Sequence, residues 1–266
     1  MGITIGAIHP QNEPGYETRY PSCLWTAAGE TKFIGTYLGP TFASRSVKAE
    51  IYLGTMSNND AGKDGTIVTT VNGDATASSY VKGYGLQWNM LPIVTGLKSR
   101  NLNIVQSEHK CGNYPWNPAG FPAFNPDKAP NDYAYAVESW GYIRDWIKAG
   151  VNVYSAWNMV LDTAGKNLDS MRPWPQNALL TVDTTAKTLT VTPVYYVFRH
   201  ASQYVDPGAK VVGTTGGDAL AFKNPDGTIV AVLYNSGAAK KMIVAVAGKK
   251  EQFDMPANGW ATLNWK

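Results

Sequence analysis

The sequence carries little charge. Asp, Glu, Lys and Arg make up 16% of the 266 residues, against a usual quarter, and the formal net charge is only +3. The longest basic runs are the pairs Lys240-Lys241 and Lys249-Lys250, which argues against a nucleic-acid partner. No run approaches eighteen apolar residues, so no membrane span is predicted. Low charge suits a secreted or extracellular protein, and we expect that location.

Cysteine, histidine and phosphate-binding loops are also scarce. The two cysteines, Cys23 and Cys111, are expected to be free thiols rather than a disulfide. The three histidines are not spaced as a metal site, so we expect no metal. Neither a GxGxxG nor a GxxxxGK[ST] loop is present, which argues against a nucleotide-binding, doubly wound sheet. We therefore expect no cofactor.

Predicted strands alternate with predicted helices through most of the chain. The strands are Ile3–Ile8, Ala49–Met56, Tyr80–Trp88, Asn103–Glu108 and Val151–Trp157. The helices between them have apolar stripes and begin at capping residues such as Thr26 and Asn131. The pattern predicts an α/β fold, a partial (β/α) TIM-type barrel of about five parallel strands, in residues 1–207. A full barrel needs eight strands, so three are unaccounted for.

The character of the chain changes at Gly208. Helical periodicity stops, and five short alternating runs follow between turn signals such as Asn224-Pro225-Asp226-Gly227 and Asn258-Gly259. Residues 208–266 are therefore predicted to form a small antiparallel, β-sandwich-like domain.

Two carboxylates stand at predicted strand ends. Glu13 follows the first strand within Pro10-Gln11-Asn12-Glu13-Pro14, and Glu108 ends the fourth. The carboxyl ends of barrel strands meet at one face, where barrel proteins place their chemistry. Cleavage of a glycosidic bond needs such a pair, one acid that protonates the leaving oxygen and one carboxylate opposite. A lone glutamate in a polar turn would be the plainer interpretation of Glu13.

Aromatic residues are abundant, with nine Trp and fifteen Tyr. Several lie near the two glutamates and could stack on sugar rings, whereas Trp140 and Trp146 lie on a predicted helix and are expected in the core. Asn12 could hold the 2-hydroxyl of the sugar. The candidate substrate-binding residues are Asn12, Tyr20, Trp25, Trp88, Trp116 and Trp157.

Four segments together resemble glycoside hydrolase family 30, over essentially the whole chain. HPQNEPGYETRYPSCLWT is similar to the family's acid/base segment, and IVQSEHKCGNYPW is similar to its nucleophile strand. VYSAWNMVLDTAGK and TPVYYVFRHASQYVDPGAKVV resemble its eighth strand and last helix.

The resemblance implies a (β/α)8 barrel with an attached β-sandwich and a retaining mechanism. It implies that Glu13 is the general acid/base, with a raised pKa, and that Glu108 is an ionised nucleophile. It also implies that Asn12 binds a hydroxyl of the sugar and that Trp157 forms the aromatic floor of the −1 subsite. The five predicted strands would correspond to strands four to eight. An incomplete barrel has two open edges, so we expect self-association into a homo-oligomer.

Three functions stay open at this point. The first is a retaining β-glycosidase acting on a carbohydrate substrate, with a β-glucan or β-glucoside favoured. The second is a non-catalytic carbohydrate-binding relic. The third is a subunit of a split enzyme that needs a complementary polypeptide.

Overall fold

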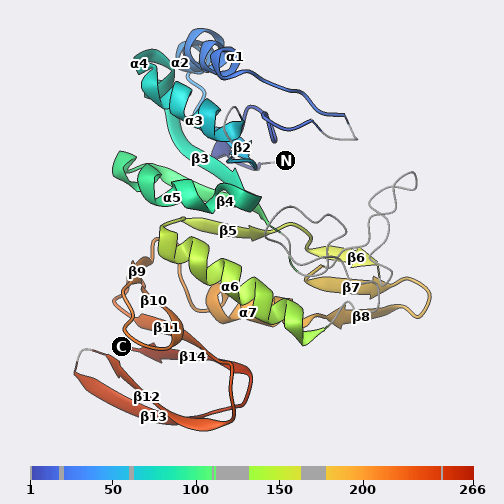
Figure 1. Cartoon of the computed structure of the whole chain (residues 1–266), viewed down its shortest axis with the longest axis vertical. Helices are drawn as coiled ribbons and strands as arrows, with labels where there is room; N and C mark the ends of the chain where they lie inside the picture. The colour runs from blue at the N-terminus through green and yellow to red at the C-terminus, as the bar shows by residue number, and fades with distance from the viewer. Residues whose placement is uncertain are drawn as a thin grey trace. The chain divides into compact units, whose positions relative to one another are not determined.

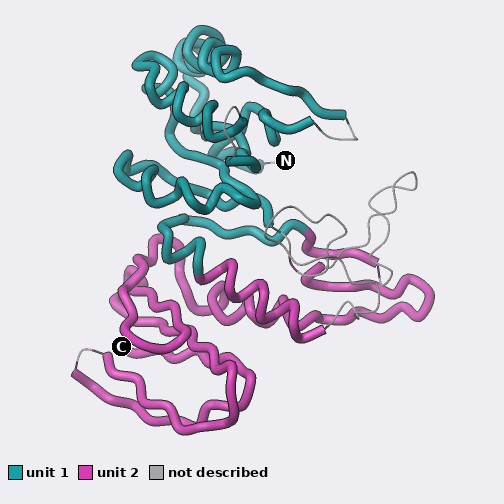
Figure 2. Tube along the Cα trace, in the orientation of Figure 1, with its two compact units in different colours: residues 1–110, 145–157 teal, residues 111–144, 158–266 magenta. Residues whose placement is uncertain are grey.

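The computed structural model describes residues 2–17, 21–59, 63–109, 111, 132–162, 178–246 and 248–266. The chain divides into two compact units (Figure 2). The first contains Met1–Lys110 and Asp145–Trp157, and the second contains Cys111–Arg144 and Asn158–Lys266. The division at Gly208 inferred from composition stays a prediction. Within the described residues, no helix has the length and apolarity needed to cross a membrane.

The first unit contains a sheet of five strands that are all parallel and follow one another in chain order (Figure 1). Its strands are β1 (Ala7–Ile8), β2 (Glu50–Met56), β3 (Val81–Gln87), β4 (Asn103–His109) and β5 (Val153–Ala156). Helices connect successive strands, which is the arrangement of half a (β/α) barrel. The predicted partial barrel of five strands is confirmed.

The connecting helices begin and end close to the predicted positions. They are α1 (Ala27–Lys32), the π-helix η1 (Phe33–Leu38), α2 (Gly39–Ser44), α3 (Asp64–Gly73), α4 (Ala75–Tyr80), the 3-10 helix η2 (Trp88–Met90), α5 (Leu91–Leu97), the 3-10 helix η3 (Lys98–Arg100) and α6 (Tyr133–Ala149). The Thr26 side chain caps α1 by accepting the N–H of Gly29 at 3.0 Å, as predicted. The helix expected over residues 66–79 is divided, because Asp74 caps a new helix by accepting the N–H of Ala77 at 2.7 Å. The predicted cap Asn131 lies outside the described residues.

The first strand is shorter than the sequence predicts. It covers only Ala7–Ile8, whereas Ile3 and Ile5 are 76% and 58% exposed. The neighbouring strand β2 begins at Glu50, which lies opposite Ala7, so the earlier residues have no partner strand within the described part of the chain. The prediction of a buried strand from Ile3 onward was therefore wrong.

The core of the first unit lies against β2, β3 and β4. The side chains of Leu53, Met56, Tyr84, Leu86 and Ile104 are at most 1% exposed. Each apolar side chain buried in this way contributes about 1.5–3 kcal/mol to stability. Trp146 of α6, at 1% exposure, is a core residue as predicted.

The second unit consists mainly of antiparallel sheet. A four-stranded sheet has the order β14-β11-β10-β9, and a hairpin joins β12 to β13. The apolar side chains of Ala219, Ala221, Ala231, Leu233 and Met255 form a buried cluster, against which Met242, Val244 and Phe253 of the hairpin pack. This is the predicted β-sandwich. Its strands are β9 (Lys210–Val212), β10 (Asp218–Lys223), β11 (Ile229–Asn235), β12 (Lys240–Val246), β13 (Lys249–Met255) and β14 (Gly259–Trp265).

A three-stranded sheet in this unit was not predicted. It pairs β6 (Val160–Asp162) with β7 (Leu180–Asp183), and β7 with β8 (Thr188–Val191). These strands are short and β8 is largely exposed, so they lack the alternation of apolar residues that marks a strand. The last helix, α7 (Pro193–Ser202), begins with its proline in the first turn, as predicted.

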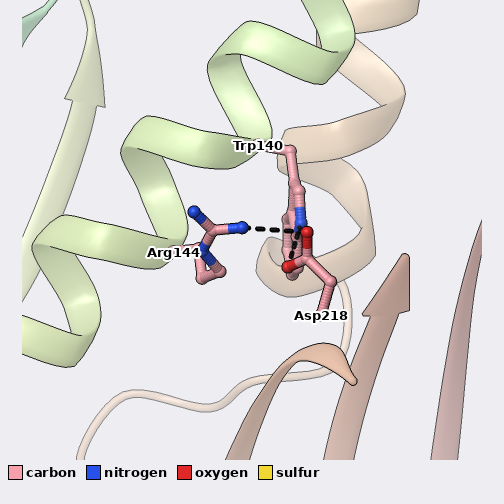
Figure 3. A network of polar contacts seen from close by, with 3 residues as sticks. All are labelled: Trp140, Arg144 and Asp218. Carbon is pink, nitrogen blue, oxygen red and sulfur yellow. Dashed lines mark hydrogen bonds and ion pairs between the residues drawn. The ribbon is translucent and has the colours of Figure 1, made fainter. Parts of the chain in front are cut away.

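A polar contact fastens α6 to the beginning of β10 within the second unit (Figure 3). The indole N–H of Trp140 donates to Oδ1 of Asp218 at 2.8 Å, and the Arg144 guanidinium donates to Oδ2 at 2.8 Å. The Trp140 side chain is only 2% exposed, so it is a core residue as predicted. One carboxylate thus satisfies a buried indole and pairs with an arginine.

Candidate active site

The described candidate residues gather where the strands of the first unit end. Glu13 follows β1, Trp88 follows β3, Glu108 lies near the end of β4 and Trp157 follows β5. The carboxyl ends of parallel strands share one edge, which explains this convergence of residues far apart in the sequence. Two candidates, Tyr20 and Trp116, lie outside the described residues.

Main-chain hydrogen bonds fix the turn that carries Glu13. Its N–H donates to the carbonyl of Thr55 at 3.0 Å, and its carbonyl accepts the N–H of Tyr16 at 3.0 Å. The N–H of Thr55 in turn donates to the carbonyl of Gln11 at 3.1 Å. Glu13 has φ of 47°, a left-handed conformation that costs a non-glycine residue of order 1 kcal/mol or more. The turn is therefore held to Thr55 of β2 at Gln11 and at Glu13.

Two side chains orient the amide of Asn12. Its Oδ1 accepts the hydroxyl of Thr55 at 2.6 Å and the amide N–H of Gln87 at 2.9 Å. Both bonds use the oxygen, and Asn12 itself is exposed. Its amide nitrogen, a donor only, is left for a hydroxyl of a ligand. Gln87 is 1% exposed, so a buried residue of β3 holds this exposed amide.

The two carboxyl groups are electrostatically coupled. Burial, the larger cause, and the charge of Glu13 together raise the pKa of Glu108 to about 7, against a hydrogen bond with Trp88 that lowers it. The resemblance implied an ionised Glu108, whereas burial within the sheet favours its protonated form. The raised pKa expected of Glu13 stays a prediction.

Aromatic rings pack together at the strand ends near Glu108, which forms a hydrogen bond with Trp88. The Trp88 and Trp157 rings meet edge to face with centroids 5.6 Å apart, and Trp88 also lies 5.6 Å from the His109 ring. The N–H of Trp157 donates to the carbonyl of His109 at 2.9 Å, which ties the end of β5 to the end of β4. His109 and Tyr154 lie 6.1 Å apart at the ring centroids. Trp88 and Trp157 are half-buried and can offer apolar surface to a sugar ring.

Trp25 contacts the segment directly after Glu13. Its N–H donates to the carbonyl of Pro14 at 2.8 Å, and its ring meets that of Phe33 edge to face at 5.0 Å. Trp25, Phe33, Tyr37 and Leu24 line a pocket of about 470 Å³. Trp25 therefore lines a pocket beside the turn that carries Glu13.

Thr55 and Gln87 are site residues that the sequence did not reveal. Gln87 immediately precedes Trp88 in a predicted strand, where a buried glutamine reads as one member of a mostly apolar run. A polar residue at the last position of a barrel strand is the only signal that could have pointed to it. Both cysteines are free, Cys23 exposed and Cys111 buried. In the described part of the chain, no three His, Cys, Asp or Glu side chains gather as metal ligands.

Comparisons with known proteins agree with this geometry. The family described as "Glycosyl hydrolase family 30 beta sandwich domain" matches residues 208–263. The Caenorhabditis elegans protein named "Putative glucosylceramidase 4" is 27% identical over 270 residues, which cover 93% of this chain and 49% of that protein. The chain thus spans about half the length of the curated relatives it matches.

Solved structures show the same fold. SrfJ from Salmonella typhimurium matches with a TM-score of 0.81 and 23% identity, over 100% of this chain and 58% of that one. The endo-β-1,6-glucanase BT3312 matches with a TM-score of 0.79 and 23% identity, over 99% of this chain and 59% of that one.

The half barrel, its strand-end glutamates and the β-sandwich place the chain in the class of (β/α)-barrel proteins with an attached sandwich. The family match at residues 208–263 and the curated relatives support membership of glycoside hydrolase family 30, and the resemblance found in the sequence is confirmed.

Proposed function

We propose that this chain carries the reacting carboxyl pair of a retaining β-glycosidase, with Glu108 as nucleophile and Glu13 as general acid/base. The observation that carries the proposal is the electrostatic interaction of Glu13, which follows β1, with Glu108, near the end of β4 of the same parallel sheet. Retaining enzymes need their two carboxyl groups about 5 Å apart, close enough for such coupling.

In the first step, the Glu108 carboxylate attacks the anomeric carbon and forms a glycosyl ester. The bond between that carbon and the glycosidic oxygen breaks, and Glu13 gives its proton to the departing oxygen. In the second step, Glu13 takes a proton from water as the water oxygen attacks the anomeric carbon. The ester bond breaks, the sugar leaves with its configuration retained, and Glu108 is a carboxylate again.

The pKa of Glu108 sets the acidic side of the pH profile. Glu108 attacks only when ionised, so kcat/KM should rise with pH through about 7. Glu13 must hold a proton when the leaving group departs, so kcat/KM should fall again at higher pH. The pair shares one proton in the active form, and the two carboxyls titrate as a coupled unit. The proposal therefore includes a bell-shaped profile.

The favoured substrate is a β-glucan or β-glucoside. Curated relatives carry the name glucosylceramidase and a structural neighbour is an endo-β-1,6-glucanase, both of which act on β-linked glucose. Asn12 would donate its amide N–H to the 2-hydroxyl, where a hydrogen bond strengthens in the transition state. Trp88 and Trp157 would contact the apolar face of the sugar bound at Glu108.

The test is hydrolysis of a panel of β-linked glucans and aryl β-glucosides by the purified chain. Glu108→Gln and Glu13→Gln should each abolish turnover, whereas Glu50→Gln, at an exposed position at the start of β2, should not. A 2-deoxy-2-fluoro glucoside should add one glycosyl mass to the peptide that contains Glu108. Turnover that survives Glu108→Gln, or a label on another residue, would contradict the proposal.

A partner chain is a second element of the proposal. Among the described strands, β1 pairs only with β2 and β5 only with β4, so both ends of the sheet have an open edge. Such edges invite strand pairing, and Ile3 and Ile5 are exposed beside β1. We propose either homo-oligomerisation or a complementary polypeptide that adds strands. Light scattering distinguishes the oligomer, and rescue of turnover by an added polypeptide distinguishes the subunit of a split enzyme. Secretion stays a prediction from the low charge.

A further inference from the structure

A buried aspartate holds the turn that carries Glu13. Oδ1 of Asp64 accepts the N–H of Gly15 at 2.6 Å, and Oδ2 accepts the N–H groups of Ser57 and Asn58 at 2.6 and 3.0 Å. The Asp64 side chain is 0% exposed and stands at the first residue of α3. One carboxylate thereby joins the segment after β1 to the segment after β2.

The contact leaves no space for a side chain at Gly15. A Cβ at this position would lie 2.3 Å from Oδ1 and 2.9 Å from the backbone nitrogen of Asp64. The backbone nitrogen belongs to a helix and cannot move aside as a flexible side chain would. Gly15 lies two residues after Glu13, and the Glu13 carbonyl accepts the next amide along, that of Tyr16. A shift of Asp64 would therefore also shift Gly15 and the turn that carries Glu13 two residues earlier.

A second buried carboxyl lies close to Asp64. Glu30 of α1 is 0% exposed, and neither of its carboxyl oxygens has a hydrogen-bond partner among the described residues. Burial, the larger cause, and the Asp64 charge together raise the pKa of Glu30 to about 7. α1 and α3 pack against each other, which brings the two carboxyls together.

We propose that Asp64 is a positioning residue for Glu13 and that Glu30, buried as an uncharged acid, keeps Asp64 in that role. The proposal rests on the function proposed above only where it names Glu13 as the acid/base. The placement of the turn by Asp64 is a claim about structure and can be tested without substrate.

The different roles of Asp64 and Glu30 follow from the N–H groups that each carboxyl group accepts. Burial raises the pKa of Asp64, but three N–H groups oppose this rise by stabilising its anion, whereas Glu30 has no donor among the described residues and is buried more cheaply with its proton. A second negative charge on Glu30 would repel Asp64. The Asp64 charge acts on Glu30, and the nearest lysines in sequence, Lys32 and Lys63, are exposed. Ionisation of Glu30 should therefore push Asp64 away from Gly15.

Amide hydrogen exchange in the full chain tests the first half of the proposal. Asp64→Asn should raise the exchange rates of the Gly15, Ser57 and Asn58 amides at least tenfold. Asp74→Asn is the matched control, because Asp74 caps α4 through Ala77 and does not touch the turn. It should raise exchange only near Ala77. An unchanged Gly15 rate in Asp64→Asn would overturn the proposal.

Glu30→Gln tests the second half and keeps the test valid if Asp64→Asn does not fold. In the wild type, exchange of the Gly15 amide, corrected for its intrinsic pH dependence, should increase about tenfold between pH 6 and pH 9. The increase should be absent in Glu30→Gln and present in the control Glu50→Gln. An equal increase in Glu30→Gln would overturn the role of Glu30.

Kinetics separate positioning from the proposed reaction. If the wild type hydrolyses a β-glucoside, Asp64→Asn should lower kcat 10- to 100-fold with little change in KM, because misplacement by about 1 Å costs about 100-fold. A kcat within twofold of the wild type would overturn the positioning role. If the wild type hydrolyses nothing, the proposed function fails, while the exchange rates still decide whether Asp64 holds the turn.

Discussion

Replacement of Glu30 by glutamine should remove much of the pH dependence of stability. Glu30 has an ordinary pKa of 4.5 and a pKa of about 7 in the folded chain. A folded-state pKa above the unfolded value means that the folded chain holds the proton more tightly. The corresponding stability is fully present below about pH 4.5 and is lost as the pH rises to about 7.

The size of this loss follows from the shift. One pKa unit corresponds to about 1.4 kcal/mol, so Glu30 should cost about 3 kcal/mol of unfolding free energy between pH 4.5 and pH 8. Glu108 has a similar pKa and should add a loss of the same sign. Glutamine at position 30 cannot ionise, although its amide would be buried without a partner at a cost of about 1–3 kcal/mol. The pH dependence, rather than the absolute stability, is therefore the quantity to compare.

Urea unfolding at pH 5 and pH 8 provides the assay. The wild type should lose about 3 kcal/mol more between these values than Glu30→Gln does, and Glu50→Gln should behave as the wild type. Equal losses in the wild type and Glu30→Gln would refute the reasoning, because they would mean that the buried carboxyl does not change its proton affinity on folding.

Three further predictions follow from single contacts. Glu13→Gln should lower the pKa of Glu108 from about 7 without restoring the ordinary value, because burial is the larger cause; an NMR titration of Glu108 that shows no change would contradict the coupling. Gln87→Ala should lower kcat/KM about tenfold, and adding it to Asn12→Ala should cost little more, since both act on one hydrogen bond; additive effects would separate the two residues. Asp218→Asn should lower the unfolding free energy by about 1–2 kcal/mol, measured with urea, because Arg144 loses its carboxylate partner; an unchanged value would show that the contact is dispensable.

Sequence patterns predicted the helices and strands that bury one face or both faces. The apolar runs at β2 and β3 are strands with both faces largely buried, whereas β4 alternates between buried and half-buried residues. Glu108 was found because it ends the predicted fourth strand, and Glu13 because it follows the first. The same reasoning failed at Ile3–Gly6, where apolar residues have no neighbouring strand in the described chain. Hydrophobicity predicts that a segment can be buried. Whether the segment is buried depends on a neighbouring strand that pairs with it.

Polar residues that act through a partner distant in the sequence were not predictable. Gln87 reaches Asn12 across 75 positions, and Asp64 reaches Gly15 across 49. In the sequence, Asp64 lies in a run of Asn, Asp and Gly residues that predicts a polar loop before the helix expected over residues 66–79. Glu30 reads as a solvent-facing residue beside Lys32. Only the packing of α1 on α3 turns these two into buried carboxyls.

The two carboxyl pairs, Glu13 with Glu108 and Asp64 with Glu30, need different protonation states for their proposed roles. Of Glu13 and Glu108, Glu13 must release and regain a proton in each proposed turnover, whereas Glu108 must be ionised when it attacks. Asp64 and Glu30 must not exchange a proton, because Asp64 holds the turn only as an acceptor. The hydrogen bonds to Asp64, and the lack of any for Glu30 among the described residues, keep these two protonation states apart. On the alkaline side of the proposed bell-shaped profile, where Glu30 is ionised, the placement of the Glu13 turn should weaken as the proposed activity falls.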